Sequence, residues 1–171
     1  DQALNVGFTR SAYWLRLTLR NASSVPVARL IDIGQSTLSN IQFFHPQADG
    51  SQRTVSTGAA WPFSTRAYRD RFFVFPVTLP SHTSQTFYFR VQSANGMLIP
   101  ATLWEPQAFQ VHQRNSYAIQ AAYVGIATAL VLYNLLLFFT LRDVVHLLYA
   151  IFATTMALAV SAANGFGMEL L

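Results

Sequence analysis

Aromatic side chains next to arginines are the residues of this sequence best suited to bind a ligand. One group lies in a stretch without regular periodicity and consists of Trp61, Arg66, Tyr68 and Arg69. A second group lies on predicted strands and consists of Trp14, Arg16 and Arg90. An aromatic ring can stack on a sugar ring, and a guanidinium group donates paired hydrogen bonds to polar or anionic groups. Both groups therefore predict binding of a small polar or carbohydrate-like ligand. The first is favoured, because long loops on rigid sheets usually carry function.

Each group also has an explanation that involves no ligand. Trp14 and Trp104 would fill a second core layer of a two-sheet sandwich, with the arginine side chains lying over it. Trp61, followed by Pro62 and Phe63, would close one end of the sandwich while the arginines stay in solvent. For any single residue of the second group, the packing explanation is favoured.

The residues that usually carry catalysis or hold a metal are scattered along the chain. No two of the histidines have the spacing of metal ligands: His45, His82, His112 and His146. The sequence contains no nucleophile-elbow motif and no glycine-rich phosphate loop. Asp49 is best explained as a turn former and Asp32 as a strand-end residue, and calcium binding by them is left open because acidic clustering is missing. We expect a segment that is not an enzyme and holds no cofactor and no metal.

The basic residues argue against a nucleic-acid partner. All eleven are arginines, and ten of them lie in residues 1–114, scattered one or two to a strand. Nucleic-acid surfaces usually mix lysine with arginine and cluster them. The absence of cysteine fits a reduced cytosol and a bacterial periplasm equally.

Residues 1–106 have the pattern of a mainly β domain. In Tyr13–Arg20, apolar side chains alternate with polar ones, which is typical of a half-buried strand. Further strands are predicted at Arg29–Ile33, Ile41–His45, Arg53–Thr57, Arg71–Leu79, Gln85–Gln92 and Met97–Trp104, the last interrupted at Pro100. Pro76 within one strand predicts an edge position or a bulge, because proline cannot donate to a ladder. Short strands at regular intervals favour an antiparallel sandwich or jelly roll.

The C-terminal part predicts an α-helical transmembrane hairpin. Residues 115–141 contain no charge, and their apolar body, residues 117–141, would reach about 37 Å as a helix, longer than the ~30 Å hydrocarbon core of a bilayer. A second span is predicted at residues 147–164, after a short link. Residues 107–116 are predicted to be a helical connector that runs on into the first span, with Pro106 tolerated in the first turn. Residues 117–171 would thus hold two transmembrane helices.

Small residues at four-residue spacing predict where the spans pack. They are Ala121, Gly125 and Ala129 in the first span, and Ala153, Ala157 and Ser161 in the second. Small side chains let helices approach closely in lipid. Asn134 is polar at membrane depth, so it is expected to face protein and to bond another helix. A channel or transporter is disfavoured, because neither span contains an ionisable residue.

Several segments resemble a known receptor family. GFTRSAYWLRLTLRN, GAAWPFSTR and FYFRVQSANGMLIPATLW are similar to the second type of extracellular domain of bacterial 7TM-DISM receptors, which are seven-transmembrane receptors with diverse intracellular signalling modules. YVGIATALVLYNLLLFFTLRDVVHLLYAIF, followed by NGFG, is similar to the first two helices of their membrane unit. The parts also occur in the family's order.

The resemblance implies a periplasmic jelly-roll sensor of carbohydrate-like ligands that drives a cytoplasmic histidine kinase or diguanylate cyclase. It also implies an inner-membrane protein with residues 1–114 in the periplasm. The remaining helices and the output module would be its partners in the same protein, and a homodimer is left open. On this comparison, opening strands, a signal peptide, five helices and the output module are expected outside the chain. The alternative is a glycan-binding module that anchors a membrane enzyme of envelope metabolism.

Overall fold

The computed structural model describes residues 4–7, 11–47, 51–93 and 97–166. The predicted turn at Asp49 and Gly50 lies outside the described residues. The chain forms two compact units, one rich in strands and one helical, which meet inside a helix between Phe109 and Gln110. Each unit has its own internal packing and is described separately.

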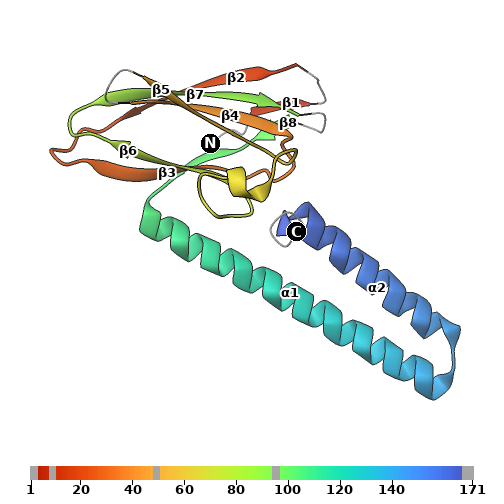
Figure 1. The fold of residues 1–171 in the computed structure, drawn as a ribbon. Helices are drawn as coiled ribbons and strands as arrows, with labels where there is room; N and C mark the ends of the chain where they lie inside the picture. Colours follow the sequence, from red (N-terminus) through yellow and green to blue (C-terminus); the bar gives the residue numbers. More distant parts are fainter. Residues whose placement is uncertain (1–3, 8–10, 48–50, 94–96, 167–171) are drawn as a thin grey trace. The chain divides into compact units, whose positions relative to one another are not determined.

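The first unit consists of nine described strands (Figure 1). Their bounds are β1 Leu4–Gly7, β2 Tyr13–Arg20, β3 Val27–Ile33, β4 Asn40–Pro46, β5 Gln52–Thr57, β6 Phe73–Leu79, β7 Ser84–Gln92, β8 Met97–Ile99 and β9 Ala101–Trp104. One sheet has the order β2-β7-β4-β5, a second has the order β6-β3-β9, and β1 pairs with β8. All the pairs are antiparallel.

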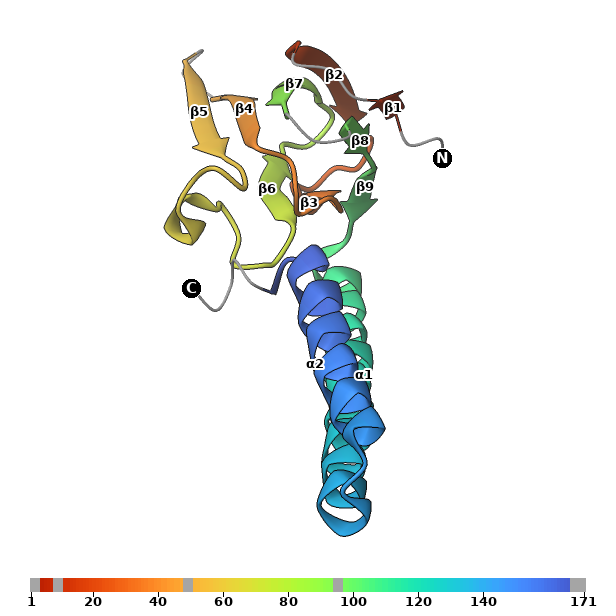
Figure 2. The same cartoon turned by 90° about the vertical axis from the view of Figure 1, so that its right-hand side faces the viewer.

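The strand pairs are nested, which makes the sandwich a jelly roll. β4 pairs with β5, β3 with β6, β2 with β7 and β1 with β8, so a long hairpin is rolled into two layers. Figure 2 shows the two layers of the roll. The predicted mainly β sandwich, followed by a helical hairpin, is therefore confirmed.

The alternation of side chains explains the main core. The inward residues of β4, β6 and β7 include Phe43, Phe75 and Phe89, each at most 4% exposed. The Phe43 ring centroid lies 4.8 Å from that of Phe75 and 4.7 Å from that of Phe89. These contacts bind the two sheets together, because period-two strands place one apolar face of each sheet inside.

Several strand details differ from the sequence pattern. β1 was not predicted, because its four residues are too few to show a period. Met97–Trp104 is two strands in different sheets, since Pro100 breaks the ladder where the chain crosses between layers. Pro76 lies on β6, which is an edge strand as predicted.

The long segment between β5 and β6 is a loop that contains a single 3₁₀ turn, η1, at Phe63–Thr65. It begins at Gly58, which has a φ of +147°. A Cβ atom at this position would lie 2.2 Å from the backbone oxygen of Ser39. Only glycine fits here, so the loop leaves the sandwich at a fixed point.

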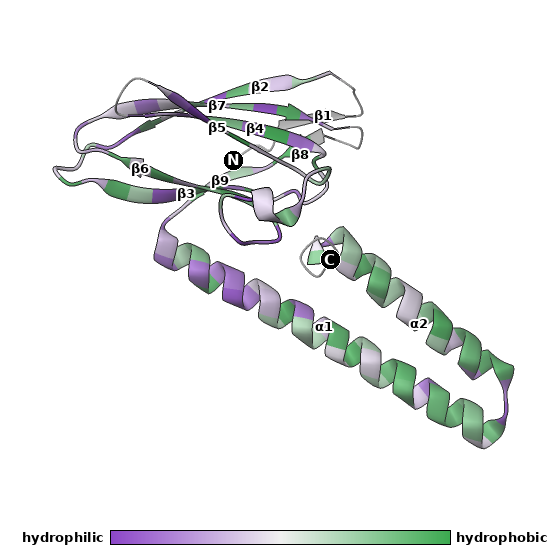
Figure 3. Ribbon diagram, viewed as in Figure 1, coloured by the Kyte–Doolittle hydropathy of each residue, from purple (hydrophilic) through white to green (hydrophobic). Residues whose placement is uncertain are grey.

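The second unit is a pair of helices. α1 spans Pro106–Leu141 without a break, and α2 spans Val144–Ala163. Asp143 caps α2, because its side chain accepts a hydrogen bond from the backbone N–H of Val145. The cap explains why α2 begins three residues before the predicted span. Both helices are long and apolar enough to cross a membrane. Figure 3 shows that hydrophilic residues gather in the first turns of α1 and that its remainder and α2 are hydrophobic.

Candidate ligand-binding sites

The outer face of the β2-β7-β4-β5 sheet carries exposed aromatic and arginine side chains. Strand register places Trp14 opposite Arg90, and Arg16 opposite Tyr88. Tyr88 in turn lies opposite Phe44 of β4. We call these five residues the sheet-face platform.

The aromatic rings of the platform stack at the surface. The Trp14 ring centroid lies 5.3 Å from that of Phe44, with 26° between the ring planes. Trp14 is nevertheless 60% exposed and Tyr88 is 37% exposed. Trp14 therefore belongs to no second core layer, and its indole face is open to a ligand.

Two neutral side chains hold Arg90 in position on this face. Its guanidinium group donates to the side-chain oxygen of Gln42 at 3.2 Å and to that of Gln92 at 3.3 Å. Farther along the sheet, Thr18 of β2 and Thr86 of β7 share a hydroxyl hydrogen bond of 3.0 Å. The face thus offers aromatic rings beside amide, hydroxyl and guanidinium groups, the donor set that suits sugar hydroxyls.

In the loop, Arg66 is held by the protein itself. Its Nη1 donates to the backbone oxygens of Asp70 at 2.6 Å and Phe72 at 3.4 Å. Its guanidinium carbon lies 4.6 Å from the ring centroid of Phe63 and 4.7 Å from that of Phe73. Arg66 therefore fixes the shape of the loop and ties it to β6.

The other loop candidates are dispersed around Arg66. Trp61 is 39% exposed, so it does not fully close an end of the sandwich, and it lines neither of two hollows that Arg66 lines. Arg69 is exposed and lines the smaller hollow, of about 370 Å³, with Phe63 and Ser64. The structure does not gather the first predicted group into one pocket.

Tyr68 belongs to a second, smaller core that we call the junction cluster. It consists of Leu30, Tyr68, Val74, Trp104 and Phe109. The Phe109 ring makes edge contacts with Tyr68, at 5.6 Å between centroids, and with Trp104, at 6.3 Å. Phe109 is 2% exposed and lies in the first turns of α1. The cluster thus packs the loop and the β6-β3-β9 sheet against the start of α1.

A buried carboxyl group lies on the same sheet. Asp32 of β3 is 7% exposed, and its Oδ1 atom has no hydrogen-bond partner within the part of the chain that the structure describes. Burial raises the pKa of Asp32 to about 6, and the charge of Asp70 adds to this, while the Trp104 side chain acts in the opposite direction. From the sequence, Asp32 is interpreted as an ordinary strand-end residue. Its burial cannot be predicted, because it depends on the tertiary structure.

A polar cavity of about 390 Å³ lies where the loop meets the edge of the sandwich. We call it the loop cavity, and its lining residues are Phe43, His45, Arg53, Val55, Ser64, Thr65, Arg66, Ala67 and Pro76. His45 of β4 lies directly opposite Arg53 of β5. Burial, and next the charge of Arg53, lower the pKa of His45.

His45 and Arg53 were not among the sequence candidates. Both flank the predicted hairpin around Pro46, and its register would have placed them side by side on one face. Phe44 was missed because an aromatic residue within a strand that also contributes Phe43 to the core is usually interpreted as a packing residue. Among the described residues, no group of three or more His, Asp or Glu side chains could hold a metal ion.

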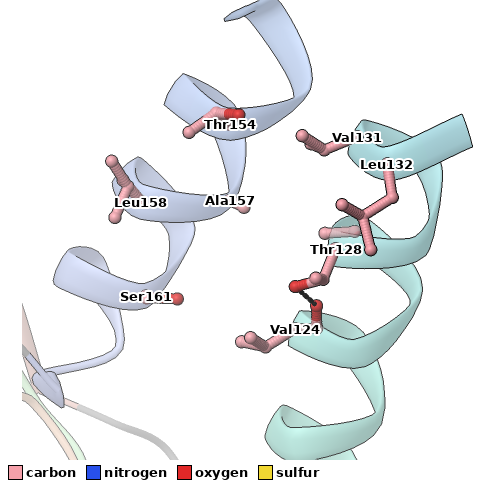
Figure 4. Close-up of a pocket in the computed structure, with 9 residues that line it drawn as sticks. Val124, Thr128, Val131, Leu132, Thr154, Ala157, Leu158 and Ser161 are labelled. Carbon is pink, nitrogen blue, oxygen red and sulfur yellow. Dashed lines mark hydrogen bonds between the residues drawn. The ribbon is translucent and has the colours of Figure 1, made fainter. Parts of the chain in front are cut away.

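The two helices face each other along a seam of mixed composition and come close at few points. Ala150 of α2 is 3% exposed, and Gln120 of α1 donates to the Ser161 hydroxyl at 3.3 Å. A hollow of about 280 Å³ is lined by residues of both helices. Figure 4 shows Ala157 and Ser161 of α2 on one side of it and Val131 of α1 on the other. Small residues of α2 therefore line its seam with α1.

The first-span candidates lie elsewhere. Ala121, Gly125 and Ala129 are exposed, and a Cβ atom built on Gly125 would meet no atom within 4 Å. This row therefore does not pack against α2, contrary to the prediction. The Asn134 side chain donates to the backbone oxygen of Leu130 in its own helix, at 2.9 Å, instead of bonding across to α2. Such a back-bond satisfies an amide at membrane depth.

Two family descriptions match this chain, one for each unit. Residues 1–105 match 7TMR-DISM extracellular 2, and residues 116–171 match 7TM diverse intracellular signalling. No curated protein matches the chain.

Proposed function

The chain belongs to the family of seven-transmembrane receptors with diverse intracellular signalling modules, and from this premise we propose that its jelly roll senses a carbohydrate-like ligand at the sheet-face platform. As a member it is part of a membrane receptor with an extracytoplasmic domain. The observation that carries the proposal is the exposure of Trp14, an indole stacked on Phe44 with 60% of its surface in solvent. Together with exposed Tyr88 on the same face, it forms an exposed aromatic patch, and such patches mark interaction sites.

The platform is a better candidate than the loop for a sugar. Its rings and donors lie on one rigid sheet, whereas the Arg66 guanidinium is already bonded to loop carbonyls and stacked between rings. A ring stack contributes about 1 kcal/mol beyond area burial, and a hydrogen bond from a charged donor about 1.5–3 kcal/mol. A stack on Trp14 with bonds from Arg16 and Arg90 therefore supports a Kd in the micromolar-to-millimolar range, which suits a reversible sensor.

The junction cluster supports a route for the signal. Tyr68 comes from the loop, Trp104 from β9, and Phe109 from α1. A change in the packing of the loop, or of the β6-β3-β9 sheet, therefore acts on the start of α1. α1 has no break between Phe109 and Leu141, so displacement of its first turns is passed along a stiff rod. The proposed receiver is a cytoplasmic histidine kinase or diguanylate cyclase of the same protein.

The proposal includes a location and an orientation. The β domain is placed in the periplasm of a bacterium, α1 and α2 in the inner membrane, and the Arg142–His146 link in the cytoplasm. The lipid bilayer and further helices of the same protein surround α1, whose open small-residue row fits a neighbouring helix.

The test compares two exposed tryptophans. The chain, purified in a neutral detergent, is titrated by calorimetry with a panel of neutral mono- and disaccharides. Trp14→Ala is expected to weaken binding at least tenfold with little change in Tm, because the side chain is exposed. Trp61→Ala is the matched control and is expected to bind like wild type.

The opposite pattern, with binding lost in Trp61→Ala and kept in Trp14→Ala, would move the site to the loop. Absence of sugar binding in wild type would remove the proposed ligand class.

A further inference from the structure

The loop cavity differs in chemistry from the sheet-face platform. It opens on the inner side of the β4–β5 hairpin, where His45 lies beside Phe43 and Phe87 with ring centroids 5.9 Å and 5.5 Å away. Its volume of about 390 Å³ falls in the range of small-molecule sites. The platform occupies the opposite, outward face of the same sheet, so the two regions are separate.

The charge of the cavity has a single sign. Among the described residues, its lining includes two arginines and one histidine but no carboxylate. Arg66 is fixed by hydrogen bonds to backbone carbonyls and by its two ring contacts, so its positive charge has a set position. Arg53 is exposed on the last strand of its sheet and can turn its planar donors inward. The Ser64 and Thr65 hydroxyls complete a set of hydrogen-bonding groups.

A purely structural role does not account for this lining. Arg66 and the packing of Tyr68 on Val74 already secure the loop to β6, and Arg53 is not needed for that purpose. The two guanidinium groups around this hollow repel each other, and the charge of Arg53 also opposes protonation of His45, so the empty state is destabilised. The arrangement is favourable once a negative charge occupies the hollow.

We propose that the loop cavity is a binding site for a small anionic molecule carrying a carboxylate, sulfate or phosphate group. Arg53 supplies a paired hydrogen bond to the anionic group, Arg66 supplies fixed positive charge, and the Ser64 and Thr65 hydroxyls orient the rest of the molecule. This site is additional to sugar binding at the platform. It gives the receptor an anionic ligand or co-ligand.

His45 makes the affinity depend on pH. Arg53 of β5 and Arg66 of the loop both line the cavity with it, while β7 and β6 contribute the uncharged Phe87 and Pro76. Burial and Arg53 lower the pKa of His45 in the empty site, and a bound anion reverses the effect of Arg53. Binding therefore favours protonation of His45, so affinity rises as pH falls.

The experiment uses pairs of probes that differ in charge. The purified chain in neutral detergent is titrated with galacturonate and galactose, which differ in one carboxylate, and separately with inorganic phosphate and sulfate. Arg53→Gln is compared with Arg20→Gln, an exposed strand arginine outside both sites. His45→Gln is compared with wild type at about pH 5.5 and about pH 7.5, either side of the ordinary imidazole pKa. Tm is recorded for every variant.

We expect at least one anion to bind to wild type, with affinity at least tenfold weaker in Arg53→Gln and unchanged in Arg20→Gln. Binding should be several-fold tighter at the lower pH in wild type and flat in His45→Gln. Trp14→Ala should leave anion binding intact, which separates this site from the platform.

Three results would overturn the proposal. They are no binding of any anion, equal weakening by Arg53→Gln and Arg20→Gln, or equal affinity for galacturonate and galactose. Because Arg53 is exposed, an unchanged Tm is expected for Arg53→Gln, so loss of binding in it reports the site rather than unfolding.

Discussion

Asp32 gives the β domain an unusual dependence of stability on pH. The side chain is 7% exposed, and its pKa rises from 3.8 to about 6 on folding. A carboxyl group whose folded pKa is raised binds more protons in the native state than in the unfolded state between these two values. The free energy of unfolding therefore falls as pH rises from about 4 to about 6, and it stays lower above that range.

The magnitude follows from the size of the shift. A change from 3.8 to about 6 is roughly two pKa units, and each unit corresponds to about 1.4 kcal/mol. Ionised Asp32 thus costs about 3 kcal/mol at neutral pH. Asp32→Asn keeps the shape but cannot ionise, so it should stabilise the domain by up to this amount at pH 7 and by little near pH 4. For a domain of this size the gain corresponds to a Tm rise of roughly 10 °C or more.

The measurement is Tm against pH for wild type and Asp32→Asn, in the purified chain in neutral detergent. The other carboxyl groups titrate alike in both proteins, so their effects cancel in the difference. Asp70→Asn serves as a second variant, because its amide oxygen can still accept the hydrogen bond from the Phe72 backbone N–H. Removing the charge of Asp70 should move the Asp32 step to lower pH. Parallel pH profiles for wild type and Asp32→Asn, or a less stable Asp32→Asn protein at pH 7, would refute the reasoning.

Other predictions concern the junction, the helices and the topology. Phe109→Ala should lower the stability of the β domain by about 3 kcal/mol, because a side chain 2% exposed leaves a cavity, and equilibrium denaturation with a near-zero loss would contradict this. Ala157→Leu should change the packing of α1 against α2, because the new side chain enters the hollow of about 280 Å³ between them, whereas Gly125→Leu should leave that packing unchanged. The yield of disulfide trapping between the helices compares the two variants, and an equal change in both would mean that Gly125 also faces α2. The chain has no cysteine, so Ser84→Cys and Val144→Cys can be labelled in intact cells with an impermeant reagent, which should reach only position 84; labelling at position 144 instead would reverse the orientation.

Much of the fold can be predicted from local patterns. The alternation of apolar and polar residues in Tyr13–Arg20 predicts both ends of β2 correctly, because a strand with one buried face has a period of two. The charge-free run up to Leu141 likewise predicts α1, since only a helix satisfies its own backbone in lipid. Pro76 predicts an edge strand for the equally local reason that it lacks a donor.

The candidate sites depend on contacts between segments far apart in the chain. The sequence predicts that Trp14 and Arg90 point outward, but only the pairing of β2 with β7 and β4 sets them beside Phe44. In the sequence, Arg66 is a candidate to bind a ligand. In the structure, backbone carbonyls and aromatic rings of the folded loop hold it, and no periodic pattern in the sequence predicts these contacts.

Burial and helix neighbours are also decided only by the tertiary structure. Asp32 is an ordinary strand residue until the loop and β9 cover it, and its pKa follows from that covering. Ala157 and Gly125 belong to similar small-residue rows, but one lines the seam and the other is open, because which face a helix buries depends on its partner. The spacing of residues along the chain determines which of them share a face of a helix or strand. The packing of these elements determines which face is buried and which is free to bind a ligand.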